Sequence, residues 1–236
     1  MTRRLTLALA ALLAPMLALA APPGPYRADY EVLRNGSVLG RAEVELARDG
    51  DAWTLTSHTR GTEGLAALAG ADIRERSTLR WRDGRPETTG YRYEQKTAFN
   101  TRKRSLEVDA AKGQIVSRDR KDSRTLTWTP GVLDRQLVAL ALAQDLAAGK
   151  REVEYQVAER RAVEPQRYRL AGTESVQVPD GRIDAARVER IREGDSGRTT
   201  TIWLDPARDY LPVRTVQREK DGETIEMRLV GVEPAG

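Results

Sequence analysis

Few residues in this sequence have a type and a spacing that could do chemistry. The chain holds a single histidine, His58, and no cysteine, which rules out disulfide bonds, a cysteine nucleophile, and zinc or copper sites of ordinary composition. Two nearby pairs of aspartates, Asp119 with Asp122 and Asp205 with Asp209, do not match a calcium-binding loop. The glycines stand singly and not in a phosphate-binding loop. We therefore predict no metal and no cofactor.

One segment, Gly194-Asp195-Ser196-Gly197, resembles the nucleophile segment of trypsin-like serine proteases. That family continues with a glycine and a proline, whereas Arg198 and Thr199 follow here, and it sets its histidine in Thr-Ala-Ala-His-Cys, whereas His58 follows Leu-Thr-Ser. We therefore interpret 193–197 as a polar loop between two strands. A pair of carboxylates for glycoside hydrolysis stays open, since any two strands can bring acids together. We expect that the chain is not an enzyme.

The aromatic residues are the best candidates for a binding role. Four tryptophans and seven tyrosines accompany a single phenylalanine, Phe99, and ordinary core packing accounts for most of them. A sharper interpretation is that some of them line a pocket for an apolar ligand. The predicted ligand-binding residues are Trp81, Tyr93, Trp128, Leu137 and Leu140.

The N-terminus has the pattern of a cleavable secretory signal. Arg3 and Arg4 precede an apolar stretch over 5–19, which ends on Ala18-Leu19-Ala20, so we predict cleavage between Ala20 and Ala21. A retained membrane anchor is the alternative, but the stretch is shorter than the ~20 residues that span a bilayer. No second long apolar run follows. We therefore predict a signal peptide over 1–20 and a single β-rich domain over 21–236, soluble in the periplasm, with no transmembrane segment after cleavage.

The charge of the mature chain is close to balanced. With Arg3 and Arg4 removed, 37 basic residues face 35 acidic ones, and acids are interleaved along most of the chain. A nucleic-acid-binding protein needs a concentrated basic face, so we predict no nucleic-acid partner. Contact with anionic lipid headgroups stays open.

Alternation of apolar and polar residues dominates the mature chain and predicts about a dozen strands. Asn35-Gly36, Asp83-Gly84, Asp180-Gly181 and Asp221-Gly222 supply the chemistry of tight turns between them. The alternating segments lie near 26–32, 38–46, 53–57, 73–81, 91–93, 102–108, 114–118, 124–128, 152–158, 166–170, 173–178, 184–192, 199–204, 212–218 and 223–232. This pattern is typical of a sandwich, a barrel or a large curved antiparallel sheet.

Two segments break the alternation. Residues 64–70 are apolar between two glycines and predict a short helical turn or a flap. Residues 129–149 predict the one long helix: Thr129 can cap it, Pro130 suits its first turn, Asp134 favours its positive end, and Gly149 ends it. Its apolar run over 137–143 covers every face, so we expect the helix to be buried.

Several C-terminal strings resemble an uncharacterised bacterial envelope family, domain of unknown function 3108. They are Thr201-Ile202-Trp203-Leu204-Asp205, Tyr210-Leu211-Pro212-Val213-Arg214 and Lys220-Asp221-Gly222. The N-terminal Val38-Leu39-Gly40 and the Val132-Leu133-Asp134 that would open the helix agree with it, over about residues 26–233. Arg135-Gln136 departs from the Leu-Ser of that family.

This resemblance implies a fold similar to the periplasmic carriers that move lipoproteins between membranes. The expected fold is mainly β: a strongly curved antiparallel half-barrel of about 10–12 strands, with one buried helix, at about 130–148, on its concave side. Those carriers hold acyl chains there. No residue of their binding sites can be matched onto this sequence, so the lipid follows from the fold alone.

Within the resemblance, we expect Leu211-Pro212-Val213-Arg214 to be architectural. Proline cannot donate to a strand ladder, so Pro212 should begin a strand or lie on an edge. Val213 should point inward, and Arg214 should point outward or reach Glu226 or Glu189.

Two functions from different classes follow. The first is a periplasmic binding or accessory protein that holds a hydrophobic ligand, a lipid or acyl chain, on its concave face. The second is a structural or interaction module of the envelope that docks a partner protein and whose barrel is filled by its own side chains. A dry interior and an exposed edge strand would favour the second, and a hydroxyl residue beside His58 would revive a hydrolase.

Overall fold

The computed structural model describes residues 22–192, 194 and 197–235. The predicted signal, its cleavage site and Ser196 of the polar loop lie outside the described residues. None of the helices in the described ranges is long and apolar enough to cross a bilayer.

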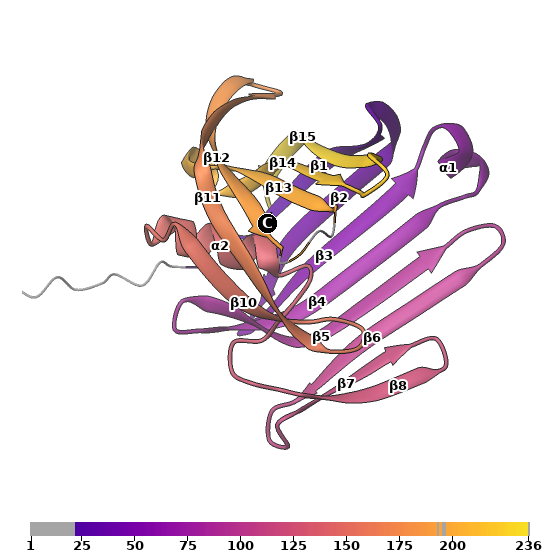
Figure 1. The fold of residues 1–236 in the computed structure, drawn as a ribbon, viewed down its shortest axis with the longest axis vertical. Coiled ribbons are helices and arrows are strands. Elements are labelled where there is room, and N and C mark those ends of the chain that lie inside the picture. The colour runs from indigo at the N-terminus through magenta and orange to yellow at the C-terminus, as the bar shows by residue number, and fades with distance from the viewer. Residues whose placement is uncertain (1–21, 193, 195–196, 236) are drawn as a thin grey trace, which may run out of the picture.

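In the described part of the chain, fifteen strands form one sheet (Figure 1). The strands are β1 (Tyr26–Arg34), β2 (Ser37–Asp49), β3 (Ala52–Gly61), β4 (Asp72–Arg82), β5 (Arg85–Lys96), β6 (Thr101–Asp109), β7 (Gln114–Asp119), β8 (Asp122–Thr127), β9 (Leu133–Asp134), β10 (Glu152–Ala158), β11 (Val163–Val178), β12 (Gly181–Ile191), β13 (Thr199–Asp205), β14 (Leu211–Arg218) and β15 (Thr224–Pro234). The helices are α1 (Gly64–Leu68), α2 (Val138–Ala147) and the 3-10 helix η1 (Pro206–Arg208).

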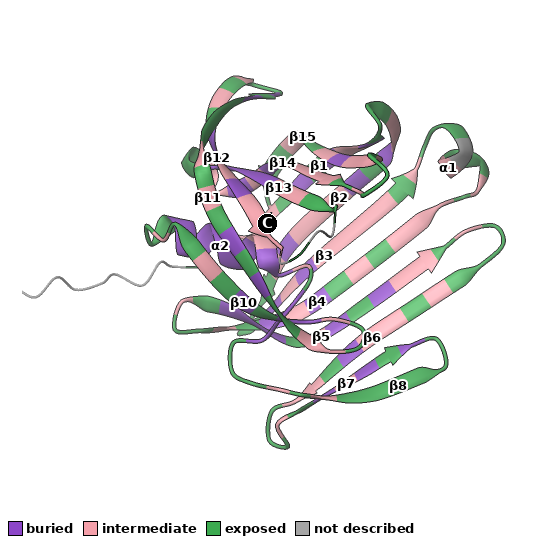
Figure 2. Cartoon of the chain, in the orientation of Figure 1, coloured by how far each residue is buried: buried purple, intermediate pink, exposed green. Residues whose placement is uncertain are grey.

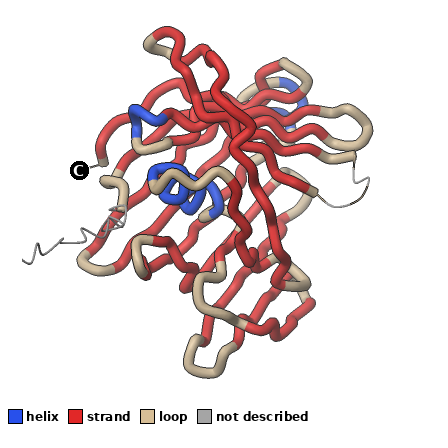
Figure 3. Tube along the Cα trace, turned by 60° about the vertical axis from the view of Figure 1, so that its left-hand side comes forward, coloured by secondary structure: helices blue, strands red, loops and turns tan. Residues whose placement is uncertain are grey.

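Most strands pair with their neighbours in sequence. The order across the sheet runs from β8 down to β1, then to β15 and down to β9, so the first and last strands pair in its middle. All pairs are antiparallel except β9 with β10. Strands β8 and β9 are the two edges and do not pair with each other, so the sheet curves without closing (Figure 3). The predicted curved half-barrel is confirmed.

The sheet has fifteen strands where ten to twelve were expected. Almost every alternating segment forms a strand of its own. The exceptions are 166–170 and 173–178, which belong to one strand, β11, with an irregularity between Leu170 and Gly172, and β9, which adds a strand of two residues inside the predicted helix. The turns are as predicted: Asn35 and Gly36 both have positive φ, 49° and 82°.

The helix is shorter than predicted. It covers 138–147 and not 130–148, and Leu137, its N-cap, provides no side-chain cap. Thr129 therefore does not cap it. Asp134 is drawn away from a helical position because its carboxylate accepts hydrogen bonds from Ser77 and Thr88 on the sheet. Leu133 and Asp134 are extended and form β9. The predicted end of the helix at Gly149, which has a φ of 79°, is correct.

Helix α2 lies within the curve of the sheet, as expected for the concave side (Figure 3). Its Leu137, Leu140 and Leu142 share one core with strand residues from both halves of the sheet, among them Leu55 of β3 and Leu204 of β13. Buried residues concentrate on the helix and alternate with exposed ones along the strands (Figure 2). The apolar run thus fills the space that the curved sheet encloses.

A second cluster joins the two ends of the sheet. Tyr91, Leu106 and Ile115 of β5–β7 pack against Val132 and Ala158, which come from the segment before β9 and from β10. The β5–β8 end of the sheet therefore lies against the β9–β11 end. The two are held by side chains and by a backbone hydrogen bond from the Thr88 N–H to the Val132 carbonyl at 3.0 Å, and not by strand pairing.

The Leu-Pro-Val-Arg segment is placed as predicted. Pro212 is the second residue of β14, and Val213 is 1% exposed. The Arg214 Nε donates to Glu226 Oε1 at 2.7 Å, and its guanidinium lies 4.7 Å from the centre of the Trp203 ring. The segment is a scaffold element that ties β14 to both of its neighbours.

Candidate functional site

The five residues predicted to bind a ligand fall into two clusters. Leu137 and Leu140 lie in the core around α2, and Trp81 packs against that core. Tyr93 belongs to the second cluster, with Trp128 packed against it. The structure therefore does not bring the five together around one cavity, and their ligand-binding role stays a prediction.

The interior around α2 is filled by the chain itself. The cavity described there, bordered by Leu142, Leu146, Tyr168 and Val188 among others, has a volume of about 10 Å³. A volume of this size holds about one water molecule. An acyl chain does not fit in this cavity.

Asp134 is the most strongly perturbed acid of the interior. It is fully buried, and its carboxylate accepts hydrogen bonds from Ser77 Oγ at 2.9 Å, Thr88 Oγ1 at 3.0 Å and the Gln136 N–H at 2.9 Å. Burial raises the pKa of the Asp134 carboxyl to about 6, against the opposing effect of these donors. The donors all belong to the fold, so the group joins β9 to β4 and β5.

Other buried carboxylates are neutralised by arginine or lysine. Glu87 binds Arg80 and Arg82 and accepts from the Gly131 N–H at 2.6 Å, and these partners lower its pKa although burial alone would raise it. Asp145 binds Arg85 at 3.1 Å. Such pairing is typical of structural ion pairs, because a catalytic carboxyl needs an oxygen free to reach a substrate.

His58 is also engaged by the fold. Its Nε2 lies 2.7 Å from Asp72 Oδ2. Thr56 and Ser57 are near it in sequence, but no hydrogen bond joins His58 to a hydroxyl among the residues the structure describes. That the chain is not an enzyme stays a prediction.

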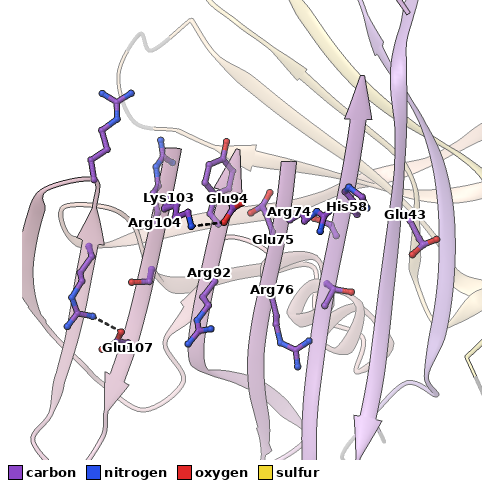
Figure 4. A pocket seen from close by; sticks show the side chains of 16 residues that line it. Glu43, His58, Arg74, Glu75, Arg76, Arg92, Glu94, Lys103, Arg104 and Glu107 are labelled. Carbon is purple, nitrogen blue, oxygen red and sulfur yellow. Dashed lines mark ion pairs between the residues drawn. The ribbon is translucent and has the colours of Figure 1, made fainter. Parts of the chain in front are cut away.

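A much larger hollow lies across β2–β7. This open pocket has a volume of about 770 Å³ and is shown in Figure 4. Most of the side chains that line it come from alternate positions on the strands: Glu43, Thr56, His58, Arg74, Arg76, Arg92, Glu94, Lys103, Ser105, Glu107 and Arg118, with Arg120 just after β7.

Strand alternation explains why these side chains share a face. Successive residues of a strand point to opposite sides of the sheet. Leu55 and Leu79 point into the core, so the intervening His58, Arg74 and Arg76 point to the opposite side. The open pocket is therefore on the face that turns away from α2.

Two rows of cross-strand neighbours cross the pocket. The first is His58, Arg74, Glu94 and Lys103, in which the acid Glu94 stands between Arg74 and Lys103. Glu94 binds both Lys96 and Lys103, at 2.5 and 3.2 Å, and these hydrogen bonds lower its pKa. Arg74 binds Asp72 at 3.0 Å, so each charged side chain of this row has an ion-pair partner.

The second row is Thr56, Arg76, Arg92, Ser105 and Arg118. Between β3 and β7 it contains no carboxylate, and on β2 it continues to Glu45, opposite Thr56. Arg118 reaches Glu107 in the neighbouring row at 2.5 Å. Arg76 and Arg92 are exposed, stand directly opposite each other, and have no carboxylate oxygen within 4.0 Å among the described residues. Like charges directly opposite each other destabilise a sheet, and an anion bound between these two guanidinium groups would offset their repulsion.

The open pocket was missed by the sequence reasoning, which judged basic residues by their balance over the whole chain. A local signal was present. Arg74 and Arg76 are spaced by two on one strand, and Lys103, Arg118 and Arg120 follow on the next ones, which is the spacing that places charges on one face. Only the register of β4–β7 shows that these positions meet.

The fold is similar to that of a solved structure, the beta-barrel-like protein of domain of unknown function DUF1849 from Brucella abortus. The TM-score is 0.58 at 13% sequence identity, over 92% of this chain and 100% of that chain. At this identity the likeness shows the fold alone.

Two further structures align at lower similarity. One is MucB, with a TM-score of 0.35 and 12% sequence identity, over 93% of this chain and 56% of that chain. The other is a putative outer membrane lipoprotein-sorting protein domain from Vibrio parahaemolyticus, with a TM-score of 0.24 and 12% sequence identity, over 89% of this chain and 85% of that chain. These TM-scores carry no argument. No curated protein matches the chain. The family described as protein of unknown function (DUF3108) matches residues 25–230, which is nearly the whole described chain, and the chain belongs to this family.

Proposed function

We propose that this chain is a non-enzymatic binding or accessory protein of the bacterial cell envelope, and that it binds an anionic ligand in the open pocket on β2–β7. The observation that carries the proposal is the facing pair Arg76 and Arg92, which lies in a hollow of about 770 Å³ and has no carboxylate oxygen within 4.0 Å among the described residues.

The chemistry of the row defines the ligand. Two guanidinium groups provide planar donors that suit phosphate or carboxylate oxygens. Thr56 and Ser105 stand beside Arg76 and Arg92 in the same row and can add hydroxyl donors. Two acids of the pocket bind cations. Glu94 binds two lysines, and Glu107 binds Arg118, whose hydrogen bond is the main cause that lowers the pKa of Glu107, with the charge of Arg92 as a further cause. Glu43 lies 4.0 Å from Arg27, and 42% of its side chain is exposed. The Arg76 and Arg92 pair is thus the part of the pocket best suited to a negative group.

Calorimetric titration with inorganic pyrophosphate tests the proposal. The wild-type protein should bind, more weakly as salt is added, and Arg76→Gln with Arg92→Gln should weaken binding by at least about tenfold, since two charge-assisted hydrogen-bonding groups are lost. Arg182→Gln is the matched control, because Arg182 is exposed on β12 and bonds only to Ser175. Equal affinity in the double variant and the control would refute the anion site.

The hydrophobic ligand predicted from the sequence remains a second candidate. One feature favours it: α2 is apolar, has no side-chain cap, and carries a buried Gln144 whose Oε1 has no partner among the described residues. An acyl chain that takes the place of this helix must also break the ion pair between Asp145 of α2 and Arg85. Native extraction followed by mass spectrometry decides, and repeated recovery of ligand-free protein that takes up no lipid on challenge would exclude it.

The self-filled interior gives more support to the other prediction, an interaction module. Its partner surface would be the open pocket, and the edge strand β8, largely exposed, is a further surface for a partner protein.

Periplasmic location is part of the proposal and rests on the predicted signal. Fractionation of cells together with N-terminal sequencing of the mature protein tests it, with Ala21 expected as the first residue.

A further inference from the structure

Two large apolar side chains stand in solvent on neighbouring loops. Leu68, at the end of α1, is 82% exposed, and Phe99, between β5 and β6, is 92% exposed. Among the described residues only one other large apolar side chain is exposed, Val232 on β15, at 39%. Isolated exposed apolar residues are ordinary, whereas a patch of them marks an interaction site.

The structure joins the two loops beside these side chains. The Ala98 N–H donates to the Ala69 carbonyl at 2.8 Å, so the loops are connected next to Phe99 and Leu68. The α1 loop is also tied to the sheet at its base, where Gly61 N–H donates to Ala71 O at 2.8 Å. Figure 1 shows α1 at the end of the sheet where β5 and β6 also turn. Leu68 and Phe99 therefore lie next to the junction of two joined loops at one end of the sheet, and we call these two residues the apolar tip.

Cations adjoin this tip. The row of cross-strand neighbours nearest to it contains Arg60, Asp72 and Lys96, and the row of Arg74 and Lys103 follows two residues further along the strands. Arg60 is exposed and has no ion pair among the residues described, because Asp72 binds His58 and Arg74 instead. Beyond lies the facing pair Arg76 and Arg92. The apolar tip thus adjoins Arg60, and the row that contains Arg74 and Lys103, whose charges are paired, lies between the tip and the facing pair Arg76 and Arg92.

We propose that this end of the molecule docks on an anionic lipid bilayer, with the apolar tip entering the headgroup region and the adjoining cations contacting lipid phosphates. An apolar wedge beside basic residues is the combination that gives peripheral membrane binding, since each contribution alone is weak. The proposal rests on the anion-binding function and extends it from a soluble anion to the phosphates of a lipid bilayer. The apolar tip is needed only for binding to the bilayer and not for binding a soluble anion.

Co-sedimentation with vesicles tests the docking. Wild-type protein should bind vesicles of phosphatidylcholine with phosphatidylglycerol and should bind pure phosphatidylcholine poorly. Leu68→Ser with Phe99→Ser should reduce binding to the anionic vesicles by at least about tenfold, because two apolar side chains no longer leave water. Val232→Ser is the control, since it removes an exposed apolar side chain elsewhere and should bind as wild type does.

The same variants separate the two proposals. The tip variant should still bind pyrophosphate like wild type, whereas Arg76→Gln with Arg92→Gln should lose pyrophosphate and should also bind anionic vesicles more weakly. Leu68 and Phe99 pack against little, so the tip variant should keep the wild-type circular dichroism and melting temperature. Vesicle binding that is unchanged in the tip variant, or a wild-type protein that binds pyrophosphate but no vesicle, overturns the membrane proposal and leaves the anion site standing.

Discussion

At the scale of single residues, buried polar groups define how the strands meet the segment that leads into α2. Asp134 was expected to sit in the first turn of a helix. In the structure it is fully buried, and Ser77 and Thr88 donate hydrogen bonds to it. An aspartate can satisfy either role, and the hydroxyls that decide between them lie on β4 and β5, far away in sequence.

The raised pKa of Asp134 predicts a pH dependence of stability. Its folded pKa is about 6, against 3.8 for an ordinary aspartate, so between about pH 4 and 6 the unfolded chain ionises while the folded chain keeps its proton. Stability from this group is complete below that window and is lost as pH rises through it, by about 3 kcal/mol for two pKa units. Asp134→Asn stays neutral and should not show this loss.

Urea unfolding of both proteins from pH 4 to 7 measures it. The difference in free energy of unfolding should shift in favour of Asp134→Asn as pH rises, whatever the constant cost of the altered hydrogen bonds. If the free energies of unfolding of the two proteins changed in parallel with pH, the pKa of Asp134 in the native protein would be that of an ordinary aspartate.

At the scale of elements, β14 is the clearest case in which a local motif and its tertiary contacts agree. Val213 is 1% exposed within a cluster that includes Trp203 and Leu211. Val213→Asp should therefore cost more than about 3 kcal/mol, because it buries an unpaired charge. Arg214→Ala should cost about 1–2 kcal/mol, since the ion pair with Glu226 is exposed in part and the contact with Trp203 adds to it.

Thermal unfolding of the two variants, read beside pyrophosphate and vesicle binding, checks this assignment. Both should bind as wild type does wherever they are folded. A stable Arg214→Ala protein that has lost a binding activity would mean that Arg214 recognises a ligand and that its structural role is secondary.

At the scale of the whole molecule, the two ends of the sheet are held together by side chains. Asp119 on β7 binds Arg102 at 3.0 Å and Arg104 at 3.5 Å on β6, and Arg160, in the loop between β10 and β11, at 3.2 Å. The hydrogen bond from Arg102, followed by the charges of the arginines, lowers the pKa of Asp119 although partial burial opposes it.

Asp119→Asn should destabilise the protein by about 1–3 kcal/mol, because it leaves arginines without their shared acid at a site that is only 8% exposed. The lost stability is the part that wild type has above about pH 4 and loses on acidification. Hydrogen exchange should rise mainly in β6–β8. Asp109→Asn, which removes an exposed pair with Lys112, serves as the control and should leave exchange unchanged. An equal increase in hydrogen exchange across all strands would contradict the inference that Asp119 stabilises this end of the sheet in particular.

The sequence by itself determined the strands and their turns, because alternation and positive-φ dipeptides such as Asn35-Gly36 are local properties of the chain. It also determined that the run 137–143 is buried, since a segment apolar on every face has no side for water. Tertiary structure alone decided where α2 begins, because Asp134 can either lie in the first turn of a helix or accept hydrogen bonds from Ser77 and Thr88, which are distant in sequence. It also decided that the helix fills the interior and that the open pocket lies on the other face. Strand register, which sets Arg76 against Arg92, depends on pairing between distant segments, and no local pattern contains it.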